Sequence, residues 1–93
     1  MFDLIVEFIG TFVFLSVILA VGQPIPIVVA LLAAIYFGGH ISGGHFNPAI
    51  STMFLVKGSI SVEKYFGYIL AQILGGLVAL MFYNMSSKTV KAK

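Results

Sequence analysis

Residues Ser42 to Ala49 read Ser-Gly-Gly-His-Phe-Asn-Pro-Ala. This polar stretch lies between two runs of apolar residues. Of the 93 residues, 60% are hydrophobic and 9% are charged, whereas about a quarter of the residues in an ordinary globular domain are charged. A chain of this length cannot bury so much apolar surface inside itself. The composition therefore predicts a membrane protein whose outer surface faces lipid.

Three apolar segments predict helices that cross the bilayer. They lie at about residues 4–21, 25–38 and 65–83, and a hydrocarbon core needs about 20 helical residues. The sequence Gly-Gln-Pro that begins at Gly22 makes a short connection, which places the first two helices side by side and antiparallel. Residues 1–93 are predicted to form a single membrane unit with an all-α transmembrane fold.

Residues 39–57 are neither an ordinary loop nor a full span. Asn47 is a favoured N-cap, Pro48 suits the first helical position, and Lys57 followed by Gly58 is a typical helix end. About ten residues at ~1.5 Å each give roughly half of a ~30 Å hydrocarbon core. The pattern predicts a re-entrant half-helix that begins near the middle of the membrane.

The backbone before this half-helix predicts a polar wall. Irregular backbone at membrane depth is tolerated only where protein buries it or where it lines a watery cavity. An extended run here would present successive carbonyl oxygens, and Asn47 would cap the helix through its side-chain oxygen and leave its NH₂ free. The helix N-terminus also repels cations and protons. The predicted pore-lining residues are Gly43, Gly44, His45, Phe46, Asn47, Pro48 and Ala49.

Three segments together carry a family resemblance. Gly39 to Ala49, with the sequence Gly-His-Ile-Ser-Gly-Gly-His-Phe-Asn-Pro-Ala, resembles the first signature loop of the aquaporins, the major intrinsic protein family. Glu7 to Phe12 resembles the start of that family's first helix, and Tyr68 to Gly76 resembles part of its third. The resemblance covers about Leu4 to Tyr83 and is greatest to the N-terminal repeat of bacterial water channels. It implies half of the aquaporin fold and a passive channel for water or other small neutral solutes, glycerol included.

The sequence also departs from the family pattern. Family members contain two such repeats of opposite topology, and this chain contains one. The family's filter arginine follows the second repeat's Asn-Pro-Ala, but here the corresponding residue is Ile50 and the chain has no arginine. By resemblance, Ile27 takes the place of an aromatic filter residue on the second helix. The constriction is then expected to be wider and less polar than in a strict water channel.

A homo-oligomer of inverted copies would supply the missing half, as internal inverted repeats do. Three spans place the chain ends on opposite sides of the membrane. Two lysines then lie on one side and three on the other, and so weak a positive-inside bias permits insertion in both orientations. The five lysines are Lys57, Lys64, Lys88, Lys91 and Lys93.

Glu7 is the one carboxylate inside a predicted span, and acids in that position are functional candidates by default. It lies about one turn from the helix start, so one interpretation is that its side chain simply reaches the membrane interface. The resemblance implies a different role, in which Glu7 is buried, accepts hydrogen bonds from the signature loop and supports it.

Other chemistries find little support in the sequence. His40 and His45 are five residues apart without a cysteine or acidic partner nearby, which is a poor metal site, so no metal or other cofactor is predicted. Loop hydrogen bonding is the expected role of both, and Gln72 is expected to bond a neighbouring helix or loop. No motif of an enzyme is present, and five scattered lysines do not indicate nucleic-acid binding.

Three functions remain open on the sequence alone. The first is a water or small-solute channel in the plasma or inner membrane, assembled from inverted copies and surrounded by lipid. The second is a half-repeat that does not conduct or that needs a complementary partner. The third is a small proton-coupled exporter, which would explain Glu7 but not the signature loop.

Overall fold

The computed structural model describes residues 1–92, with side chains described as far as residue 87. The side chains of the tail lysines, Lys88, Lys91 and Lys93, lie outside this described part. Residues 1–92 form helices without any strand, which confirms the all-α prediction. The four helices are α1 (Phe2–Ala20), α2 (Pro24–Ser42), α3 (Pro48–Lys57) and α4 (Val62–Ala92).

Three of these helices are long and apolar enough to cross a membrane: Phe2–Ala20, Pro24–Ser42 and Val62–Ser87. Helix α2 continues four residues beyond the end expected at Gly38, because the two glycines there do not break it. It ends instead at Gly43, whose φ of 93° is left-handed and whose N–H bonds to the carbonyl of Gly39 at 2.8 Å. Helix α4 begins earlier than expected, where the Ser61 hydroxyl accepts a hydrogen bond from the N–H of Lys64 at 3.1 Å.

Helix α3 has both of its ends fixed by local sequence. Asn47 occupies the N-cap and Pro48 the first position, and the helix stops at Gly58, which has a φ of 88°. The carbonyl of Phe54 accepts a hydrogen bond from the N–H of Ser59 at 2.9 Å, which closes the C-terminal turn in the manner of a Schellman motif. The result is an independent ten-residue helix.

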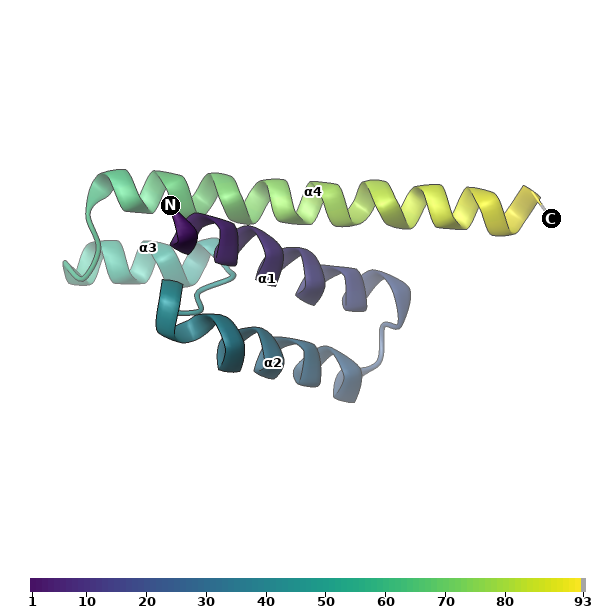
Figure 1. Cartoon of the computed structure of the whole chain (residues 1–93), viewed down its shortest axis with the longest axis horizontal. Coiled ribbons are helices and arrows are strands. Elements are labelled where there is room, and N and C mark those ends of the chain that lie inside the picture. The colour runs from purple at the N-terminus through teal and green to yellow at the C-terminus, as the bar shows by residue number, and fades with distance from the viewer. Residues whose placement is uncertain (93) are drawn as a thin grey trace.

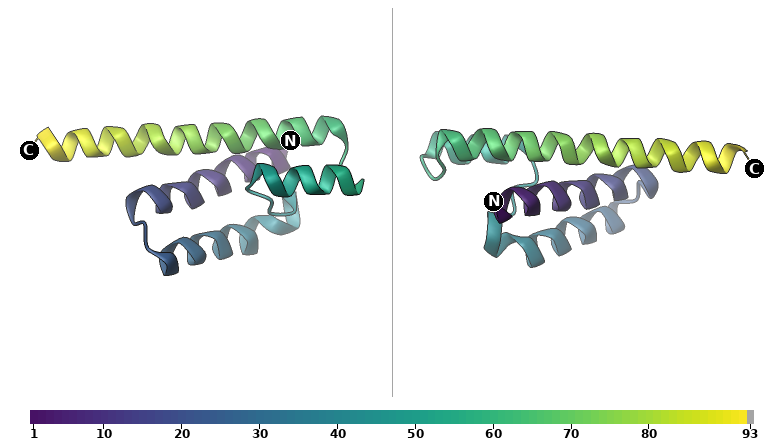
Figure 2. Two further views of the ribbon diagram at one scale, coloured as in Figure 1. Left: turned by 180° about the vertical axis from the view of Figure 1, so that it is seen from behind. Right: turned by 45° about the horizontal axis from the view of Figure 1, so that its top comes forward.

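Helix α1 is the central helix of the bundle. It packs against both α2 and α4, and α3 packs against α4. Figure 1 shows α1 and α4 running in the same direction with α2 antiparallel to them, and it places α3 alongside the first turns of α4. The view from behind in Figure 2 brings α3 to the front, at the end of the bundle where α4 begins. The link between α2 and α3 consists of residues 43–46, which precede the N-cap Asn47. It folds back toward α1.

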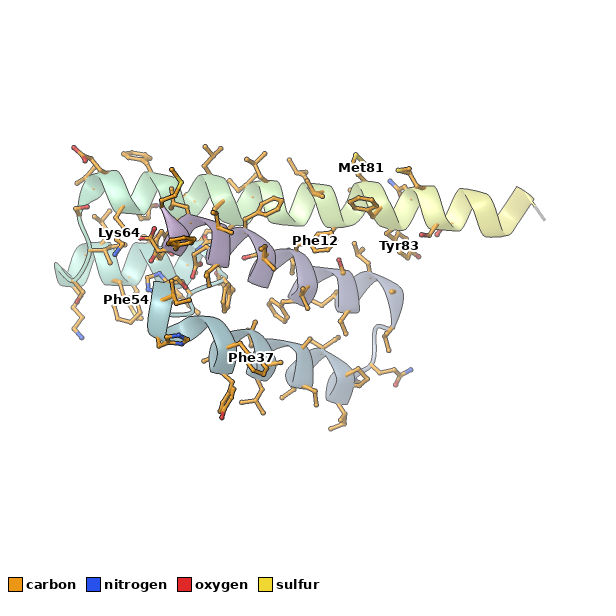
Figure 3. All side chains as sticks on the ribbon, viewed as in Figure 1. Phe12, Phe37, Phe54, Lys64, Met81 and Tyr83 are labelled. Atoms are coloured by element: carbon orange, nitrogen blue, oxygen red, sulfur yellow. The ribbon has the colours of Figure 1, made fainter. Side chains whose placement is uncertain are left out.

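The distribution of side chains is the reverse of that in a soluble domain. Figure 3 shows apolar side chains projecting from the outer sides of the long helices, as Met81 does from α4. Large apolar residues such as Leu32 and Leu70 are about 60% exposed. Six of the buried residues are polar, namely Glu7, Thr11, Ser42, His45, Ser51 and Gln72. An apolar exterior around a polar interior is the arrangement that lipid requires.

Gly75 sets the distance between α1 and α4. A Cβ at this position would lie 2.8 Å from the backbone oxygen of Phe8 and 3.2 Å from the backbone nitrogen of Phe12. Because backbone atoms cannot turn aside, we expect Gly75→Ala to force the helices apart and to destabilise the fold by about 1–3 kcal/mol. The midpoint of thermal unfolding in detergent micelles, followed by circular dichroism, measures this effect.

Gly76 supplies the matched control for this prediction. A Cβ there would meet only the Cδ1 atom of Leu15, at 3.0 Å, and that side chain can move. Gly76→Ala is therefore expected to lower the midpoint less than Gly75→Ala. Equal effects of the two substitutions would contradict the assignment of Gly75 as the close-approach point.

Candidate functional site

The site begins at the N-terminus of α3, where the side chain of Asn47 caps the helix. The side-chain Oδ1 of Asn47 accepts a hydrogen bond from the N–H of Ala49 at 2.8 Å. Because a backbone N–H can only donate, the atom that faces it must be the oxygen, and the amide nitrogen points away. Asn47, Pro48 and Ala49 are all exposed, so the start of this helix lies open on one side of the bundle.

The link before Asn47 is tightly folded. Gly43, Gly44 and Phe46 have positive φ values of 93°, 66° and 53°. The extended run expected for this stretch is therefore wrong, because left-handed residues turn the chain sharply. Phe46 is not a glycine, and its left-handed conformation is maintained by the burial of its ring, which is 2% exposed.

The link directs its donors inward. The N–H of Gly43 bonds to the last turn of α2 at 2.8 Å, and that of Gly44 to a serine hydroxyl at the end of the same helix at 3.1 Å. The N–H groups of His45 and Phe46 both bond to Glu7. By contrast, the carbonyl oxygens of these four link residues accept no hydrogen bond from residues 1–92. The link thus has one bonded side and one side of free acceptors.

Glu7 is the buried centre of this arrangement, with no exposed surface. Its Oε1 accepts hydrogen bonds from the N–H of Phe46 at 2.8 Å and from the Nε2 of Gln72 at 2.9 Å. Its Oε2 accepts from the hydroxyl of Ser42 at 2.7 Å and from the N–H of His45 at 3.1 Å. The side chain therefore points into the bundle and not to the membrane interface. Four surrounding donors match a carboxylate, which can only accept.

Ser51 ties α3 into the same network. Its hydroxyl accepts a hydrogen bond from the Nε2 of Gln72 at 2.9 Å and lies 2.8 Å from the Nδ1 of His45. The His45 ring stacks on Phe54, with centroids 4.8 Å apart, and meets the edge of Tyr68 at 5.0 Å. His45 lies outside the three candidate spans, and its burial lowers the pKa of the imidazole below 6.5. The ring is therefore neutral at pH 7.

The exposed start of α3 lies in a groove of about 360 Å³, which we call the Asn47 groove. Two of its lining residues, Thr11 and Gln72, carry buried oxygen atoms, Oγ1 and Oε1 respectively, that have no hydrogen-bond partner among the described residues. The remainder of the lining is mainly apolar. The groove is lined by Thr11, Phe14, Leu15, Phe46, Asn47, Pro48, Gln72, Ile73, Gly76 and Leu77.

The structure does not gather every candidate residue at this groove: of the predicted pore-lining residues, Phe46, Asn47 and Pro48 line it, whereas Gly43, Gly44, His45 and Ala49 do not. Ile27 lies in the first turn of α2, is half-buried, and is absent from the lining of the groove. His40 is exposed near the end of α2, away from the buried ring of His45. Residues 1–87 contain no cluster of three or more acidic, histidine or cysteine side chains able to hold a metal ion.

Sequence reasoning missed two members of the network. Ser51 lies one turn into α3 on its buried side, and Tyr68 donates its hydroxyl proton to the carbonyl of Ser42 at 2.6 Å. Tyr68 has no exposed surface. Its spacing of four residues from Gln72 was the available signal, because residues four apart share one helix face.

An apolar bundle of three candidate spans, with a short helix that starts at an inward-folded polar link, defines a multi-pass membrane protein. The chain belongs to the major intrinsic protein family, whose model matches residues 21–93. Members of this family are membrane channels and not enzymes. No solved structure was found to match the chain significantly.

Several relatives resemble the chain over more than half of its length. A glycerol uptake facilitator protein-like 6 of Lactiplantibacillus plantarum is 46% identical over an alignment of 82 residues, which covers 78% of this chain and 38% of that protein. Aquaporin Z of Photorhabdus laumondii is 38% identical over 71 residues, or 75% of this chain and 31% of that protein. The lens fiber major intrinsic protein of Gallus gallus is 44% identical over 54 residues, 57% of this chain and 21% of that protein. The matched part of the chain thus spans well under half of each relative.

Proposed function

We propose that this chain forms half of a pore for water and other small neutral solutes. The observation that carries the proposal is the polarity of the link, which bonds its N–H groups inward and leaves four carbonyl oxygens free. A carbonyl oxygen without a partner is costly at membrane depth unless water or a solute donates to it. The proposed pore wall consists of residues 43–49.

Asn47 complements these acceptors with a donor. Its oxygen is occupied by the N–H of Ala49, which leaves its NH₂ group free to donate, and Asn47 lines the Asn47 groove. A molecule with hydroxyl groups can accept from this amide, and of the four link residues Phe46 also lines the groove. The positive end of α3 meanwhile disfavours cations at this point. Neutral polar solutes fit both features.

A second copy, inserted in the opposite orientation, is our proposal for the other half of the pore. The chain covers 38% of the glycerol facilitator-like relative and carries one half-helix in residues 48–57. Its open helix start and the groove beside it leave a face that another half can cover. The nearly even distribution of lysines between the two sides supports insertion in both orientations. We keep Ile27 as the proposed constriction residue, to be tested with the assembled pore.

The two other functions are weaker proposals. A non-conducting half-repeat would have the same fold, but it would provide no donor for the free carbonyl oxygens. A proton-coupled exporter needs a carboxylate that exchanges protons with water, whereas Glu7 is enclosed by four donors. The channel accounts for more of the structure than either alternative.

Stopped-flow light scattering on vesicles that contain only this chain tests the proposal. We expect rapid shrinkage under a sucrose gradient, and shrinkage at the rate of protein-free vesicles for Asn47→Leu. The substitution removes the free amide and an N-cap contribution of about 1 kcal/mol. Asn84→Leu is the matched control, because Asn84 is exposed on α4 and does not line the Asn47 groove. This control should retain the wild-type rate.

Two results would count against the proposal. Wild-type chain that is inserted but shrinks no faster than protein-free vesicles would favour the non-conducting half-repeat. Because the chain has no cysteine, a single cysteine at Ser87 can report the side on which α4 ends. Labelling of that cysteine from one side only would exclude inverted copies and leave the partner of the half-pore to be another chain.

A further inference from the structure

The ring of Phe46 separates two grooves. One is the Asn47 groove, and the other, of about 310 Å³, runs between α1 and α2 with Ala34 and Phe37 among its lining residues. Phe46 belongs to the lining of both grooves. Its ring is 2% exposed, so it fills the wall between the grooves and projects little into either. The groove between α1 and α2 is called the α1–α2 groove below.

Two glycines make the space that this ring fills. A Cβ at Gly10 would lie 2.6 Å from the Cζ of Phe46, and a Cβ at Gly38 would lie 3.5 Å from the same atom. Neither position carries a side chain that can move into the space if the ring is shortened. A smaller residue at Phe46 therefore leaves a cavity, since side chains collapse into such sites only partially. That cavity would join the Asn47 groove to the α1–α2 groove.

We infer that Phe46 is a specificity-determining residue, whose ring sets the width available to a solute beside Asn47. This inference rests on the proposed channel function. It assigns a role to the side chain of Phe46, whereas the proposed pore uses only its backbone carbonyl. With the ring in place the groove admits water and slender solutes. With the ring shortened, bulkier neutral polyols are admitted because the wall behind Asn47 recedes into the α1–α2 groove.

The ratio of glycerol to water permeability tests the inference. Vesicles that contain wild-type chain, Phe46→Leu or Phe46→Ala are compared under sucrose, glycerol and erythritol gradients. We expect the ratio to rise by about tenfold for Phe46→Ala, with erythritol following glycerol and Phe46→Leu in between. A ratio is used because loss of folded protein lowers both permeabilities together and leaves their quotient unchanged.

Phe12→Ala is the matched control. Phe12 carries the same ring on α1, where it meets the edge of Phe82 with centroids 5.9 Å apart, and it lines neither groove. Figure 3 places Phe12 between α1 and α4. Its truncation should leave the permeability ratio at the wild-type value. An equal rise for Phe12→Ala and Phe46→Ala, or no rise for Phe46→Ala, would overturn the inference.

A second measurement does not depend on conduction. Ala34→Cys places a single thiol in the α1–α2 groove, where a small charged methanethiosulfonate reagent can label it only if water reaches it. We expect labelling to become several-fold faster when Phe46→Ala is added. An unchanged rate would refute the connection between the two grooves. Absent water flux in the wild-type chain would instead refute the channel, so the two failures are distinguishable.

Discussion

Replacing Glu7 by leucine is expected to unfold the link between α2 and α3 and to abolish any flux. The carboxylate accepts hydrogen bonds from Ser42, His45, Phe46 and Gln72, and leucine can accept none. Each buried donor left unpaired costs about 1–3 kcal/mol, and the Glu7 side chain itself has no exposed surface. The expected loss of stability is therefore more than about 3 kcal/mol.

Glu7→Gln separates the loss of charge from the loss of shape. Glutamine keeps one oxygen, which can still accept from Phe46 and Gln72. Its NH₂ group would face the Ser42 hydroxyl, which can rotate and accept, and the N–H of His45, which cannot. One hydrogen bond is lost, so we expect an intermediate stability and measurable flux.

Thermal unfolding in detergent micelles and stopped-flow flux in vesicles check the Glu7 series. The expected order is wild type, then Glu7→Gln, then Glu7→Leu in both measurements. Asp3→Asn serves as a control because Asp3 lies at the start of the same helix, where it contacts the chain terminus, Leu4 and the Lys64 ammonium but no part of the link. A Glu7→Leu variant with wild-type stability would show that the link is held by something other than its bonds to this carboxylate.

The second large effect is expected from Gly10 and Phe46 together. A Cβ at Gly10 would overlap the Phe46 ring, so Gly10→Ala must displace the ring and with it the left-handed backbone of the link. Phe46→Ala alone should cost about 3–5 kcal/mol through the cavity that it leaves. In the double variant the new methyl group occupies part of that cavity without a clash.

A double-mutant cycle measures this coupling. We expect the double variant to be more stable than the sum of the single effects predicts, by about 0.5–3 kcal/mol. Gly76→Ala combined with Phe46→Ala is the control pair, because the contact of Gly76 is with Leu15 and not with the Phe46 ring. Additive effects in the Gly10 cycle would contradict the close packing described for the ring.

The parts of the structure that were predictable from sequence are those fixed by local rules. The ends of α3 follow from Asn47, Pro48 and Gly58, because capping depends on neighbouring residues. The true end of α2 was not predictable in this way. A glycine inside a helix is unfavourable by itself, and Gly38 is accepted because its missing side chain makes room for Val6 and Phe46.

The candidate site was predictable where one segment carries it and not where distant segments meet. Asn47 as the helix cap could be predicted from its neighbours alone. The shape of the link could not, because its left-handed residues are stabilised by contacts from other helices. Ser51 and Tyr68 were missed for the same reason, since their partners lie 6 and 26 residues away along the chain. A pattern within one helix does not specify such pairings.

The bonds of Glu7 also impose an order on assembly. Its nearest partner in sequence, Ser42, follows it by 35 residues, and Gln72 follows it by 65. During synthesis from the N-terminus, α1 is therefore complete long before its carboxylate can be fully paired. We therefore expect helix α1 to reach its final place only after α4 has been made, because the last partner of its carboxylate, Gln72, lies on that helix. We expect the three spans to reach their final packing together and not one after another.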